Sequence, residues 1–122
     1  MYQQQVKHVP YLAKAVINLD ETIKGYKAIV LPAGAEILQV SVEIKTPNTA
    51  GGKKATPLNI GLNEVEDFFI KDIDLSAEGT HTSAKITSMN EKSFVSVNTE
   101  NSNAKIILRV LYFLKSEIMT EY

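Results

Sequence analysis

The chain has 122 residues, of which 44% are hydrophobic and 22% charged, with a formal net charge of −1. This length fits one domain, and the composition excludes disorder of the whole chain. The lack of cysteine excludes disulfides and thiolate metal ligands. The balance of 13 basic and 14 acidic residues argues against a nucleic-acid partner, because phosphate binding favours a basic excess.

Residues 1–10 are predicted to form a polar arm. Tyr2 and the run Gln3, Gln4 and Gln5 give this segment little to bury, and it lacks the basic and apolar regions of a signal peptide. No apolar run elsewhere approaches the roughly 20 residues that span a bilayer, so we expect a soluble chain without a membrane partner. A polar arm can reach a neighbouring chain and become ordered on binding.

From residue 11 to 115 the chain is a series of short apolar segments separated by turn residues, which is typical of an all-β domain. The clearest strand is Ile37–Ile44, where every second residue from Leu38 onward is apolar, predicting one face in the core and one in water. Further strands are predicted over 12–19, 25–31, 58–62, 70–75, 84–87, 94–98 and 104–113.

Turns or loops are predicted over 32–35, 46–56 and 79–83, with a hairpin loop over 98–103. The segment 63–69 is compatible with one or two helical turns. Residues 116–122 are predicted to be a short tail.

The segment 104–113 is apolar on both faces, which is typical of a strand in the middle of a sheet. Arg109 interrupts one of these faces. We therefore expect the face to be covered by a second layer or by a partner subunit. Together these patterns predict an all-β fold, namely an antiparallel, jelly-roll-like β-sandwich of seven to nine short strands.

Candidate catalytic, metal and cofactor residues are not evident. His8 and His81 fall in expected loops and lack metal-ligand spacing. The stretch Gly51–Lys54 departs from the phosphate-loop pattern, and a flexible loop is the preferred interpretation. The acidic residues between 64 and 74 are interpreted as a solvated face rather than a calcium site. We therefore predict no enzyme activity and no cofactor.

Residues 31–42, Leu-Pro-Ala-Gly-Ala-Glu-Ile-Leu-Gln-Val-Ser-Val, resemble a stretch of small tailed-phage virion proteins in which an LPAGA turn precedes a long alternating strand. The resemblance continues through 58–62, Asp67-Phe68, 74–79 and a closing hairpin over 94–113. It implies a small β-sandwich that decorates the capsid or forms part of a head or tail fibre.

The leading hypothesis is thus a non-enzymatic virion structural protein of the decoration, head-fibre or auxiliary type, located in the virion after synthesis in the host cytoplasm. Its expected partners are capsid or connector proteins and further copies of itself, with a trimer as one option. The candidate contact residues are Tyr2, Gln3, Gln4, Gln5, Tyr11 and Arg109. The alternatives are a carbohydrate- or receptor-binding module of a tail fibre or spike, and a small hydrolase with a scattered active site.

Overall fold

A computed structural model describes residues 3–5, 9–19, 23–47, 57–83, 85–99, 104–114 and 119–121. For residues 3–5, 9, 23–24 and 119–121 the description is limited to the backbone. None of the described residues is helical, and the all-β prediction is confirmed.

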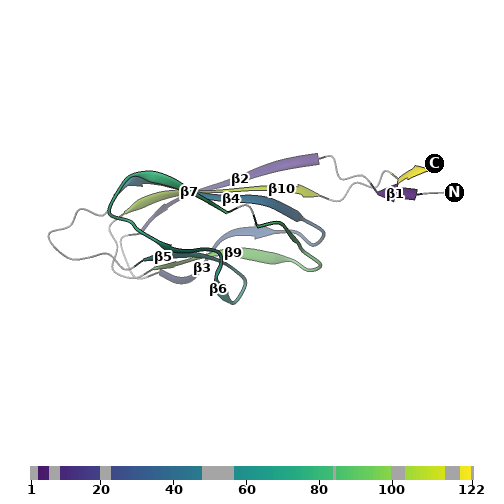
Figure 1. Ribbon diagram of the computed structural model, residues 1–122. Helices are drawn as coiled ribbons and strands as arrows, with labels where there is room; N and C mark the ends of the chain where they lie inside the picture. Colours follow the sequence, from purple (N-terminus) through teal and green to yellow (C-terminus); the bar gives the residue numbers. More distant parts are fainter. Residues whose placement is uncertain are drawn as a thin grey trace.

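Two antiparallel sheets pack face to face (Figure 1). The first, called the β10 sheet, has the order β2 (Val9–Asn18), β10 (Lys105–Leu114), β4 (Glu36–Thr46) and β7 (Gly79–Ser83), with the short β8 (Thr87–Ser88) also pairing with β4. The second, called the β9 sheet, has the order β3 (Ile23–Leu31), β9 (Ser93–Thr99), β5 (Leu58–Leu62) and β6 (Val65–Ile73).

Apart from the β5–β6 hairpin and the small β8, successive strands of the sandwich alternate between the two sheets, which gives the eight-strand jelly-roll topology. With β8 the sandwich has nine strands, within the predicted number. A separate antiparallel ribbon pairs β1 (Gln3–Gln5) with β11 (Met119–Glu121). This ribbon lies beyond the end of the sandwich, next to both termini (Figure 1).

The core lies between the sheets and is formed by branched aliphatic side chains. On β10, Ile106, Leu108 and Val110 are fully buried, and the core also contains alternate residues of β4 together with Val95 and Val97 of β9. The predicted alternation of β4 holds from Val40 to Ile44. It fails earlier because Leu111 pairs with Gln39 and Tyr112 with Ile37, so a bulge turns Ile37 rather than Leu38 into the core.

Three sequence predictions are wrong. Residues 79–83 form strand β7 rather than a turn, because they pair with β4. The expected helical turns over 63–69 are a two-residue turn followed by β6. The segment after residue 98 does not close a hairpin, since β9 and β10 belong to different sheets. The central position predicted for residues 104–113 is confirmed, as β10 lies between β2 and β4.

The strand β6 bulges outward across the neighbouring β5. Ile60 pairs with Ile70 but Leu62 pairs with Val65, so β6 holds more residues than β5 between these pairs. The bulge runs close over Gly61, where an added Cβ would overlap the Val65 carbonyl oxygen. We call residues 65–69 the β6 bulge.

One buried amide holds the β6 bulge against the sheet. Asn98 Nδ2 donates to the Glu66 carbonyl at 3.1 Å, while Asn98 Oδ1 accepts a hydrogen bond from the Gly25 amide at 2.6 Å. Asn98 is 4% exposed. Its buried side chain therefore provides a hydrogen-bond partner for one backbone group of β3, which flanks β9, and for one of β6, which flanks β5.

Candidate assembly surface

The outward face of β2 and β10 carries apolar side chains that are partly open to solvent. Leu12 is 62% exposed and Val16 is 54% exposed. In the antiparallel register, Leu12 lies opposite Leu111 and Val16 opposite Ile107, so the two strands carry two apolar cross-strand pairs, here called the apolar stripe, on either side of Lys14 and Arg109. Ile107 is buried, but Leu12 and Val16 are large apolar side chains open to solvent on the same face, which makes this face a candidate interaction surface.

Charged side chains interrupt this stripe at its middle. Arg109 Nη1 donates to Glu43 Oε1 on β4 at 2.9 Å, and both side chains are 31% exposed. Lys14 lies directly opposite Arg109 on β2, and Lys45 extends from β4. The hydrogen bond from Arg109 lowers the pKa of the Glu43 carboxyl; desolvation opposes this shift, and the nearby positive charges support it.

The six residues predicted as partner contacts do not form one surface. Arg109 is on the outward face of the β10 sheet. Tyr11 is on the opposite, inward-facing side of β2, where its ring stacks on Tyr112 with centroids 5.5 Å apart. Gln3, Gln4 and Gln5 form β1, which pairs with β11 beyond the sandwich. Tyr2 lies outside the described residues.

Leu12 and Val16 are surface residues that were not among the predicted contacts. Residues 12–17 are apolar on both faces except at Lys14, a pattern that predicts a strand but not which face is exposed. Its inward residues, Ala13 and Ala15, are small and pack against the core. The larger residues therefore lie on the outside, and this small-inside, large-outside pattern was the available signal.

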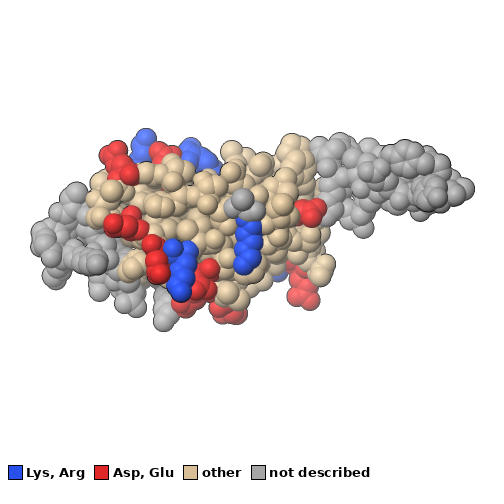
Figure 2. Space-filling view, in the orientation of Figure 1, with Lys and Arg blue, Asp and Glu red and all other residues tan. Residues whose placement is uncertain are grey.

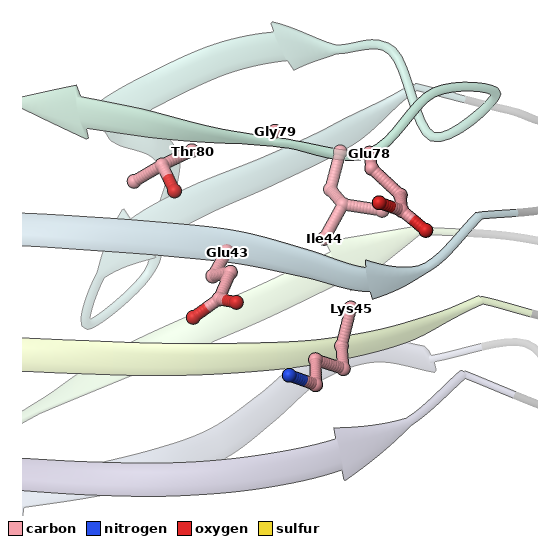
Figure 3. Close-up of a pocket in the computed structure, with 6 residues that line it drawn as sticks. All are labelled: Glu43, Ile44, Lys45, Glu78, Gly79 and Thr80. Carbon is pink, nitrogen blue, oxygen red and sulfur yellow. The ribbon is translucent and has the colours of Figure 1, made fainter.

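A pocket of about 260 Å³ lies beside the Arg109–Glu43 pair, where β4 meets β7 (Figure 3). Its lining residues are Glu43, Ile44, Lys45, Glu78, Gly79 and Thr80. Within the ranges that the structure describes, no three His, Cys, Asp or Glu residues are grouped so as to hold a metal ion. Four of the six lining residues, namely Glu43, Lys45, Glu78 and Thr80, are charged or polar, which suits a polar contact.

Of the two histidines, the structure describes His81 but not His8. His81 was expected in a loop, but it is a half-buried residue of β7 that pairs with Val42 of β4, because residues 79–83 extend the β10 sheet. His8 and the segment Gly51–Lys54 lie outside the described residues. Across the described ranges, no helix is long and apolar enough to cross a membrane.

The chain is similar to chains in solved structures of phage capsids. A chain from the acid-stable capsid of Helicobacter pylori bacteriophage KHP30 is 32% identical to this one and superposes with a TM-score of 0.82. The match covers 99% of this chain and 100% of the KHP30 chain. This chain belongs to the same family of phage capsid proteins.

Two more distant capsid structures share the fold of this capsid-protein family. A chain from the capsid of Ralstonia phage GP4 is 14% identical, with a TM-score of 0.69 over 92% of this chain and 88% of its own. A chain from the capsid of cyanophage Pam1 is 18% identical, with a TM-score of 0.62 over 86% and 84%. No family model matches the chain, and the search of curated proteins gave no match.

Proposed function

We propose that this chain is a non-enzymatic decoration protein that attaches to the phage capsid as a homo-oligomer, with a trimer as one option. The observation that carries the proposal is the end-to-end match with a KHP30 capsid chain. The unit that the two chains share is one small jelly roll. A unit of this size suits an added layer that bridges other virion proteins.

Two regions of the molecule are candidates for these contacts. One is the outward face of β2 and β10, which joins apolar side chains to the Arg109–Glu43 pair. The other is the β1–β11 ribbon, which extends beyond the sandwich (Figure 1). We propose that the arm, residues 1–10, and the tail, residues 116–122, reach the capsid through this ribbon, while the domain between them associates with other copies.

Binding to particles tests the function directly. Mass spectrometry of purified virions should detect the chain, and its absence would reject a decoration role. The purified chain should also co-sediment saturably with particles that lack it and should raise the temperature at which they release DNA. A variant lacking residues 1–5 removes β1 and should lose co-sedimentation while keeping the oligomeric state of the full chain.

A carbohydrate- or receptor-binding module is the second candidate. In its favour, Tyr11 is 42% exposed and Tyr26 is 49% exposed. Against it, the two rings come from different sheets, and the Tyr11 ring already stacks on Tyr112. A glycan array separates the candidates, because selective glycan binding without particle binding would favour the module over the decoration protein.

A further inference from the structure

We propose that copies of this chain associate head to tail, with the outward face of β2 and β10 on one copy packed against the outer edge of β6 on the next. This inference rests on the proposed homo-oligomer and specifies its two surfaces. The β2–β10 face is defined by Leu12, Lys14, Val16, Lys105, Arg109 and Leu111. The β6 margin is defined by Glu64, Val65, Glu66, Asp67, Asp72 and Ile86.

The β2–β10 face combines an apolar stripe with positive charge. Lys14 and Lys105 are exposed, and Arg109 is half-buried between the two apolar cross-strand pairs. Arg109 binds the Glu43 carboxylate at 2.9 Å. With that carboxylate bound to Arg109, the exposed Lys14 and Lys105 leave this face with an excess of positive charge.

The β6 margin has the opposite charge. Between residues 64 and 72, four exposed carboxylates accompany a single lysine, Lys71. Two large apolar side chains flank them, with Val65 52% and Ile86 65% exposed. Ile86 follows Lys85, whose Nζ lies 3.9 Å from the centre of the Phe68 ring, so this loop lies against β6. Figure 2 shows acidic side chains along the lower margin of the view, interrupted by lysines.

The fold places the two surfaces on opposite edges of one molecule. β2 ends the β10 sheet beside β3, whereas β6 ends the β9 sheet beside β7. They cannot meet within one copy. A two-fold contact of the β2–β10 face with itself would bring Lys14 and Lys105 towards their own copies, and such like-charge contacts are unfavourable. A contact between different surfaces avoids this repulsion, and it closes a ring when the rotation from one copy to the next divides a full turn.

Charge reversal on each surface provides the test. The first variant carries Lys14→Glu and Lys105→Glu, and the second carries Glu66→Lys and Asp67→Lys; the Arg109–Glu43 pair is intact in both. A third variant combines all four substitutions. A fourth, Lys27→Glu, is the control for reversing a single charge outside both surfaces, because Lys27 lies on β3 with its Nζ over the ring of Phe94 on β9. Light scattering after gel filtration gives the mass, and circular dichroism confirms that each variant folds.

The first and second variants should each weaken self-association by at least about a hundredfold, because like charges then face each other. The combined variant should recover the oligomer of the unmodified chain, since the charges are exchanged but again complementary. Recovery in the combined variant would support the pairing of these two surfaces. A monomeric unmodified chain, or an oligomer that survives both two-site variants, would overturn it.

Particle binding, measured in parallel, separates this inference from the proposed function. If the unmodified chain binds particles but the two-site variants remain oligomeric, then the decoration role stands and the head-to-tail contact is wrong. If folded two-site variants are monomeric and the combined variant stays monomeric too, the two surfaces do not pair with each other. If neither the unmodified chain nor any variant binds particles, the proposed decoration role is wrong, whatever the oligomeric state.

Discussion

Gly61→Ala should destabilise the sandwich by displacing the β6 bulge. The added Cβ would overlap the Val65 carbonyl oxygen and lie 2.7 Å from the carbonyl carbon and oxygen of Glu66, where ordinary contact begins at 3.4 Å. These are backbone atoms, so the strand itself must move. Forcing a methyl group into a packed site costs about 1–3 kcal/mol. The shift also weakens the hydrogen bond from Asn98 to Glu66, which contributes about 1 kcal/mol.

The total of about 2–4 kcal/mol corresponds to a fall in Tm of roughly 10 °C for a domain of this size. Urea unfolding at a fixed protein concentration measures it, since association alters apparent stability. Gly25→Ala is the matched control, because a Cβ there meets open space and the cost comes only from the φ of +69°, about 1 kcal/mol. Equal losses in the two variants would refute the steric argument, as would an unchanged midpoint for Gly61→Ala.

Three further predictions concern single side chains. Asn98→Ala leaves two backbone groups without their partner and should lower the free energy of unfolding by about 2–4 kcal/mol; a loss below about 1 kcal/mol in urea unfolding would contradict this. Because Arg109 lowers the pKa of Glu43, the pair stabilises the fold fully above the ordinary pKa of 4.5 and less as the pH falls through the lowered value. The stability of Glu43→Gln should therefore depend less on pH in acid, and parallel stability–pH curves would refute this. In the background of the Glu66→Lys, Asp67→Lys variant, where association is weakened, Leu108→Ala should cost about 2–5 kcal/mol, whereas Leu12→Ala at an exposed site should cost little; similar losses in thermal unfolding would argue against the assigned faces.

The sequence predicted the fold class because local alternation determines which face of a strand is buried. Val40, Val42 and Ile44 are all core residues, as their spacing indicates. The exception is Ile37, which is buried instead of Leu38 because of a bulge opposite Tyr112. A bulge depends on the pairing of two distant strands, so a single segment carries no sign of it.

Non-local pairing also explains the other errors. Residues 79–83 are polar and contain a glycine, yet they form β7 because β4 offers a free edge. A polar loop after Asn98 predicts a reversal of the chain but not whether the next strand joins the same sheet. Here it crosses to the other sheet. The candidate contact residues were scattered for the same reason: Tyr11 and Arg109 point to opposite faces of the β10 sheet.

The two strands at the edges next to the proposed contact, β2 and β6, are also unsuited to edge-to-edge pairing with another copy. On β2, Pro10 lacks an amide donor and Lys14 places a charge at the middle of the strand, both of which discourage edge-to-edge pairing. On β6, Asp72 has a φ of +56° and the register with β5 shifts twice, so the edge is irregular. Open edges that paired freely would extend a sheet from copy to copy without limit. With both edges irregular or charged, side chains of the β2–β10 face and of the β6 margin, rather than backbone pairing between strands, determine association, which permits a closed ring of defined size.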